Sequence, residues 1–164
     1  MSILLLENRA VLPRAYFVAD ATYAPGLDPS LDPRLLAPLT SGRVDLRRTV
    51  VLEGPPGPPA APAPAGPVPV DLQAYRNDYV RAQVQAPRAG YLVLSDNDYP
   101  GWRAYLDGQA VPIRRANLVV RAVAVPAGSH TVEFRYLPRS VLVGVLISLL
   151  GWLLLLAGLW RARR

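Results

Sequence analysis

The chain has 164 residues, about half of them hydrophobic, with one histidine and no cysteine. This composition excludes disulfides and thiol chemistry, and it leaves too few ligands for an ordinary zinc site. The formal charge of +6 comes from arginine without lysine, in a sequence rich in alanine, proline and glycine. A GC-rich genome explains this arginine bias, so we expect no nucleic-acid partner. From the length we expect one ordinary domain with appendages, and from the composition no cofactor or metal.

Residues 1–53 are expected to contribute strands and a loop to a β-sandwich. Met1–Leu6 is apolar, but an acidic residue follows too early for a signal peptide. Arg14–Asp20 and Leu46–Glu53 are rich in β-branched and aromatic residues, which predicts two strands. Three prolines interrupt Asp28–Thr40, which therefore reads as a loop.

Residues 54–69 form a segment in which half of the positions are proline. Proline lacks the backbone donor that a strand ladder needs, so the segment is expected to be a linker or a surface insertion. A proline-rich ligand for a recognition domain is the alternative, and we favour the spacer.

Residues 70–138 are predicted to hold the main part of the sandwich. Short alternating runs separated by turn signals predict strands at Val70–Tyr75, Tyr79–Ala86, Tyr91–Ser95, Trp102–Leu106, Gln109–Arg114, Asn117–Val125 and Thr131–Tyr136. Asp107-Gly108 is typical of a tight hairpin, and Pro126–Ser129 is expected to join the last two strands as a pair. The chain is thus predicted to be mainly β, an antiparallel, jelly-roll-like β-sandwich followed by one C-terminal transmembrane α-helix.

Residues 139–164 are predicted to be that helix with a basic tail. Val141–Trp160 is twenty residues without a charge, and at about 1.5 Å per residue it matches the ~30 Å hydrocarbon core of a bilayer. The arginines at 161, 163 and 164 predict a cytoplasmic C-terminus, which places the β domain on the outer side of the cell membrane. An outside domain without a signal peptide needs upstream spans, so we expect it to be part of a larger protein.

Small residues recur along the predicted helix. Gly144, Ser148, Gly151 and Gly158 fall on one face at 3.6 residues per turn. Such a groove allows a second helix to approach closely, which predicts a helix-packing face toward other transmembrane helices. Chance is the alternative, because glycine is frequent in membrane helices.

The candidate site residues are Asp96, Asn97, Asp98, Tyr99 and Trp102. Two acids two residues apart could act as acid and base or hold a hard cation, but a strand-to-turn corner favours the same residues for backbone reasons. Aromatic faces beside short polar groups also suit a glycan, whereas Trp102 begins an apolar strand face and suits the core. We therefore predict a possible glycan-binding site, no catalytic residue and no metal site.

Six motifs carry a family resemblance. They are Leu94–Trp102, Asp107-Gly108, Val111–Ile113, Arg115–Asn117, Arg121–Val123 and Pro126–Phe134. This pattern resembles the C-terminal extracytoplasmic domain of YfhO-family bacterial membrane proteins, and Asn8 and Leu12–Tyr16 resemble its lead-in. Asp98 stands where that family usually has Tyr, and Arg103 and Ser129 stand where it has Lys.

The resemblance implies an activity that the chain itself does not carry. The family is similar to GT-C-type membrane glycosyltransferases, which take sugars from lipid-linked donors and glycosylate cell-surface polymers such as teichoic acid. Acidic residues for such chemistry are expected in external loops of a multi-span part, outside this sequence. The chain is therefore expected to be a non-catalytic, membrane-anchored lobe. The alternative is a stand-alone surface module that binds a glycan or a protein.

Overall fold

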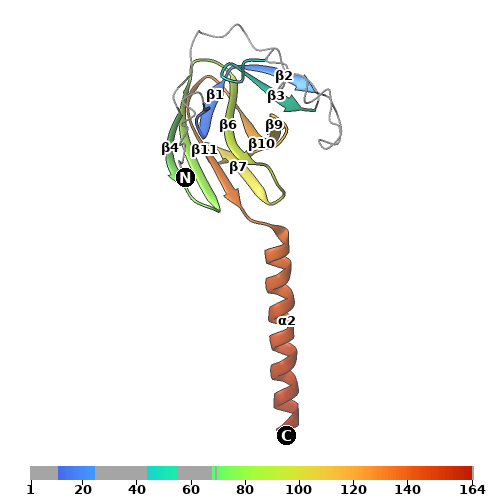
Figure 1. The fold of residues 1–164 in the computed structure, drawn as a ribbon. Helices are drawn as coiled ribbons and strands as arrows, with labels where there is room; N and C mark the ends of the chain where they lie inside the picture. Colours follow the sequence, from blue (N-terminus) through green and yellow to red (C-terminus); the bar gives the residue numbers. More distant parts are fainter. Residues whose placement is uncertain (1–10, 25–43, 55–67, 69, 164) are drawn as a thin grey trace, which may run out of the picture.

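The computed structural model describes residues 11–24, 44–54, 68 and 70–163, as two β-sheets followed by a long helix (Figure 1). In spatial order the first sheet contains β1 (Ala15–Val18), β6 (Gly90–Asn97), β10 (Val120–Val125), β9 (Arg114–Ala116), β3 (Thr49–Glu53) and β2 (Asp20–Ala24). The second contains β4 (Val70–Tyr75), β5 (Tyr79–Ala86), β11 (Gly128–Tyr136), β7 (Trp102–Leu106) and β8 (Gln109–Val111). The helix is α2 (Arg139–Ala162).

The predicted mainly β fold with antiparallel sheets and one C-terminal apolar helix is confirmed. Every strand pair described is antiparallel except β2 with β3. The predictions for Met1–Leu6, for the Asp28–Thr40 loop and for nearly all of the 54–69 segment lie outside the described residues.

The main core lies between the two sheets. In β5, Val80, Ala82, Val84 and Ala86 are buried, and the residues between them are more exposed, as the alternation predicts. They pack with Phe134 of β11 and with apolar side chains of β6 and β10. Each fully buried large apolar side chain contributes roughly 1.5–3 kcal/mol to folding, so this layer holds the sheets together.

A second core lies on the other face of the first sheet. Tyr91 and Val93 of β6 pack there with Val50 and Leu52 of β3, whereas their neighbours in β6 face the main core. A strand covered on both faces needs apolar residues at successive positions. This explains why residues 91–94 form a continuous apolar run.

One predicted strand is two strands in the structure. We expected a single strand at Arg14–Asp20, but β1 ends at Val18 and β2 begins at Asp20, at opposite edges of the same sheet. The sheet therefore curls until its edges meet near Ala19. Gly90 makes this closure possible, because a Cβ there would lie 2.5 Å from the Phe17 ring and 2.6 Å from the carbonyl oxygen of Val18.

The last two strands do not pair with each other, contrary to our prediction. β10 lies in the first sheet between β6 and β9, and β11 lies in the second between β5 and β7. The turn before Gly128 therefore crosses between the sheets. The predicted strand at Gln109–Arg114 also changes sheet, because it breaks around Pro112 into β8 and β9. Local sequence marks these turns but does not say which strand lies beside which.

Some predicted strand ends are also wrong. β10 begins at Val120 because Asn117 and Leu118 adopt positive φ values of 44° and 77° and make a turn. β3 begins at Thr49, three residues later than predicted. The Asp107-Gly108 hairpin is confirmed, with φ values of 49° and 84°.

The helix leaves the sandwich from one end (Figure 1). Strand β11 ends at Tyr136, whose N–H donates to the carbonyl of Asp78, and the N–H of Leu137 donates to that of Gly101 at 2.8 Å. The helix from Ser140 to Ala162 contains an 18-residue stretch with a mean hydropathy of 2.6 that is not buried, so by length and composition it is a candidate membrane span. We call the end of the sandwich formed by residues 96–101 and 136–138 the helix-proximal end.

Candidate functional site at the helix-proximal end

All five residues predicted as a possible glycan site lie at the helix-proximal end. Asp96 and Asn97 are the last residues of β6, not part of the turn as predicted. Asp98 and Tyr99 follow in the loop, and Trp102 opens β7. The strand continues further than predicted because Asn97 pairs with Val120, across an irregularity in the β6–β10 register.

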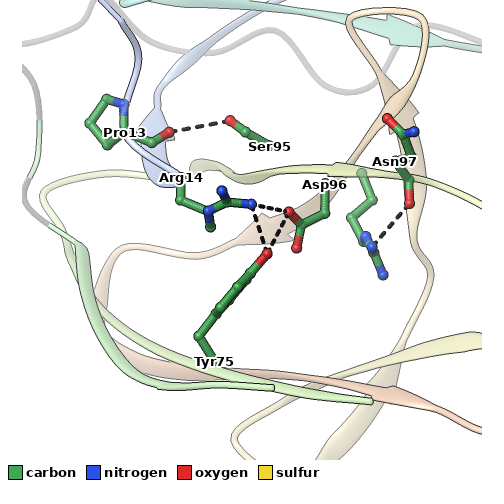
Figure 2. Close-up of polar contacts among 7 residues, drawn as sticks. Pro13, Arg14, Tyr75, Ser95, Asp96 and Asn97 are labelled. Atoms are coloured by element: carbon green, nitrogen blue, oxygen red, sulfur yellow. Dashed lines mark hydrogen bonds and ion pairs between the residues drawn. The ribbon is translucent and has the colours of Figure 1, made fainter. Parts of the chain in front are cut away.

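Asp96 is held by two partners from distant parts of the chain (Figure 2). Its Oδ1 accepts hydrogen bonds from Nη1 of Arg14 at 2.8 Å and from the hydroxyl of Tyr75 at 3.0 Å. Arg14 also donates to the Tyr75 oxygen at 2.7 Å. Burial, followed by the hydrogen bond to Asp96, raises the pKa of Tyr75, so the phenol stays protonated and donates. The three side chains form one connected cluster.

Asp98 lies in a second charged group. Its carboxylate is 4.0 Å from Nε of Arg115, whose Nη1 is 3.9 Å from the carboxylate of Glu53. Burial raises the pKa of both acids, and the nearby arginines oppose this shift. The backbone N–H of Asp98 donates to the carbonyl of Val119 at 2.6 Å. Arg115 therefore joins two part-buried carboxylates that are far apart in sequence.

Tyr99, Trp102 and Tyr136 form an aromatic cluster. The Trp102 ring centroid is 6.2 Å from that of Tyr99 and 5.3 Å from that of Tyr136, and the two tyrosines are 5.4 Å apart. Trp102 is partly buried and packs against the main core. The rings thus contact one another and the core, and glycan binding at this cluster stays a prediction.

The sequence analysis did not select the most unusual residue of this end, Arg121. Its side chain is only 1% exposed and faces the main core from β10. The guanidinium carbon lies 4.0 Å from the centroid of the Trp102 ring, and 5.9 Å and 5.8 Å from those of Tyr99 and Phe134. Nη2 donates to the carbonyl of Asn97 at 3.0 Å.

The remaining polar atoms of this arginine are poorly satisfied. Nε and Nη1 of Arg121, and Nε1 of Trp102, are buried without a hydrogen-bond partner among the described residues. Burial lowers the pKa of Arg121, and the charges of Asp96 and Asp98 partly offset this effect. Burying a cation destabilises the folded state by several kcal/mol, and a desolvated cation–π contact offsets about 2 kcal/mol of this penalty. A charged residue on the core face of an apolar strand was the signal that sequence reasoning missed.

An open cavity of about 570 Å³ adjoins this cluster at the strand-to-helix junction. Its lining residues come from the start of β7, the end of β11 and the start of α2. They are Pro100, Gly101, Trp102, Arg103, Tyr136, Leu137, Pro138 and Ser140. Gly101 has a φ of 115°, and a Cβ there would lie 2.6 Å from the Tyr136 ring. The junction is therefore close-packed on one side and hollow on the other.

The predicted helix-packing residues lie on α2, away from the sandwich. At Gly144, Gly151 and Gly158 an added Cβ would meet no atom within 4 Å, and Ser148 is exposed. Within the described ranges, three or more His, Cys, Asp or Glu side chains do not gather into a group that could hold a metal ion.

The fold and its exposed apolar helix define the class: a β-sandwich carried on one candidate membrane-spanning helix. Residues 68–148 match the family model described as bacterial membrane protein YfhO. This match confirms, over residues 68–148, the resemblance to YfhO-family bacterial membrane proteins seen in the sequence. No curated protein and no solved structure matched the chain.

Proposed function

We propose that the chain is the membrane-anchored, extracytoplasmic and non-catalytic lobe of a YfhO-like multi-span protein that takes part in glycosylating cell-surface polymers. The observation that carries this proposal is the direct continuation of the sandwich into an apolar helix that the sandwich leaves uncovered. The family match to a bacterial membrane protein supports it.

A structural use of the acids supports the non-catalytic part of the proposal. Asp96 is tied to Arg14 and Tyr75, and Asp98 lies against Arg115. A general acid and a general base must face one substrate together. Two acids that are engaged by different arginines serve the packing of this end instead. Sugar transfer is then the work of the multi-span part.

The orientation follows from the basic residues after the helix. The arginines at 161, 163 and 164 favour a C-terminus in the cytoplasm and a sandwich on the outer side. Protease protection in oriented membrane vesicles tests this arrangement. We expect inside-out vesicles to protect the sandwich and spheroplasts to expose it, and the opposite pattern would refute the orientation.

The glycine face of α2 is proposed to pack against other helices of the multi-span protein. Gly151→Leu should weaken helix association in a membrane two-hybrid assay, because the added side chain fills the groove. Ala157→Leu is the matched control, since position 157 is about 120° away around the helix. Equal signals from both variants would contradict a specific packing face.

The second candidate function is a stand-alone surface module that binds a glycan. The observation in its favour is that Asp96, Asn97, Asp98, Tyr99 and Trp102 gather at one end, where Trp102 borders the junction cavity. Genome context separates the two functions: an adjacent reading frame that encodes many apolar spans favours the lobe. Its absence favours the module.

A further inference from the structure

The exposed apolar side chains of the sandwich are not spread over its surface. Among the described residues outside α2, the exposed large hydrophobic residues are Val11, Tyr75, Tyr99, Val119 and Leu137. They come from five separate segments of the chain. Single exposed apolar residues are ordinary, but a cluster of them marks a contact surface.

The hydrogen bonds place these side chains at the helix-proximal end. Tyr75 donates to Asp96, the carbonyl of Val119 accepts from Asp98, and Leu137 donates to Gly101. Tyr99 lies in the same loop between β6 and β7. Val11 comes three residues before Arg14, whose side chain also reaches Asp96. Tyr75, Tyr99, Val119 and Leu137 therefore lie at or beside residues 96–101, and Val11 is close to Arg14 in the chain.

The connection to α2 fixes how far this end is from the bilayer. Only residues 137–139 separate the last residue of β11 from Ser140, where the candidate span begins. The four steps from Tyr136 to Ser140 reach at most about 14 Å when fully extended. The hydrogen bond from Leu137 to Gly101 shortens the connection further. If α2 spans the membrane, the helix-proximal end must lie within the headgroup region.

We propose that the helix-proximal end is a lipid-contact surface, on which Tyr75, Tyr99, Val119 and Leu137 rest in the outer interface of the bilayer. Tyrosine and tryptophan prefer this depth, where the ring is in an apolar layer and its polar atom is hydrated. The Arg14 side chain is 54% exposed at the same end, and a guanidinium there attracts lipid phosphate. The proposal rests on the proposed function, because it requires α2 to cross the membrane.

The absence of cysteine makes a direct test possible. Single-cysteine variants Tyr99→Cys and Val119→Cys, labelled with an environment-sensitive fluorophore, are reconstituted as full chains into phosphatidylethanolamine–phosphatidylglycerol vesicles. Ser129→Cys reports the opposite end of the sandwich, next to the β10–β11 crossing, and Leu150→Cys reports the middle of α2. Quenching by lipids with a shallow nitroxide is compared with quenching by aqueous iodide.

We expect lipid quenching at positions 99 and 119 to exceed that at position 129 several-fold. Iodide quenching at positions 99 and 119 should be lower than at position 129 by a similar factor. Lipid quenching equal to that at 129 would overturn the proposal. Labels protected from iodide and also from lipid nitroxide would show a protein partner and would overturn it too. A label at position 150 that deep nitroxide lipids do not quench would refute the span itself, so the two failures are distinguishable.

A charge variant tests the same surface without relying on a bulky label at its centre. In a Leu137→Cys background, Tyr99→Asp with Val119→Asp should reduce lipid quenching at position 137 several-fold, because carboxylates avoid the interface. Ser129→Asp is the matched control at the far end and should change nothing. Equal quenching in all three chains would also overturn the proposal.

Discussion

The two ends of the sandwich differ in the apolar surface that they expose. At the far end, both ring nitrogens of His130 face acceptors: Nδ1 is 2.7 Å from the Asp107 carboxylate and Nε2 is 3.3 Å from the Ala127 carbonyl. At the helix-proximal end, Arg121 is buried with two nitrogens unsatisfied among the described residues, and apolar side chains are exposed. Buried unsatisfied nitrogens also occur at the far end, where Nε and Nη1 of Arg88 in the β5–β6 turn lack partners among the described residues. The clearer difference is the exposed apolar surface of the helix-proximal end.

The helix-proximal end therefore serves a purpose other than the stability of the sandwich in water. Buried polar atoms without partners and exposed apolar side chains both reduce the stability of a domain in water. Among the described residues outside α2, the second cost is concentrated where the chain meets its helix, whereas the first occurs at both ends, at Arg121 and at Arg88.

Trp102→Ala is expected to cost about 3–5 kcal/mol of sandwich stability, because the ring packs against the main core, Tyr136 and Arg121. Thermal unfolding of the full chain in detergent, followed by circular dichroism, measures it. Tyr105→Ala, on the other face of the same strand, is the control and should cost much less. An unchanged melting temperature for the Trp102 variant would instead favour a ligand-facing ring.

Gly90→Ala tests the closure of the first sheet near the far end. The added Cβ would meet the Phe17 ring and the backbone at Val18 and Ala19 within 3 Å, so we expect a loss of about 1–3 kcal/mol. Gly108→Ala is the control, because a Cβ there meets nothing within 4 Å and only the positive φ opposes it. If both variants unfold at the same temperature, crowding at Gly90 is not what constrains this position.

Arg121→Met should leave the sandwich equally stable or up to about 2 kcal/mol more stable, because removing the buried charge relieves its desolvation while most of the volume stays. Arg115→Met should have the opposite sign, since it leaves Asp98 and Glu53 without their shared cation. Denaturant unfolding compares the two. A marked loss with Arg121→Met would mean that the buried guanidinium stabilises the fold.

The smallest effect expected is the pH dependence of the far-end pair. The hydrogen bond to Asp107 raises the pKa of His130 above 6.5, and the same bond lowers the pKa of Asp107 below 3.8. The histidine contribution is fully present below pH 6.5 and is lost as pH rises through the raised pKa. The aspartate contribution is present above pH 3.8 and is lost as pH falls through the lowered pKa.

The pair should therefore stabilise the chain most between about pH 4 and pH 6.5, by less than about 1 kcal/mol because it lies at the surface. The difference in melting temperature between the wild type and His130→Gln, measured across this range, isolates the pair from other titrating groups. A difference that does not vary with pH would show that the pair does not contribute through its charge.

Features that depend on neighbouring residues could be predicted from the sequence. The alternation in β5 predicted its buried face, and the uncharged run at 141–160 predicted the helix. Asp107-Gly108 predicted a hairpin, because both positions adopt positive φ values. The gathering of Asp96–Tyr99 with Trp102 also followed from their closeness in the chain. A period or a turn residue acts on the few residues around it, so it can be recognised without the fold.

Which strands lie side by side, and which groups each charged residue contacts, depends on the tertiary structure. Arg14 reaches Tyr75 and Asp96 across 61 and 82 positions, and Arg121 is buried because β10 lies between β6 and β9 in the first sheet. Strand order is set by how the two sheets bury their apolar faces together. That is a property of the whole chain, which no local pattern contains.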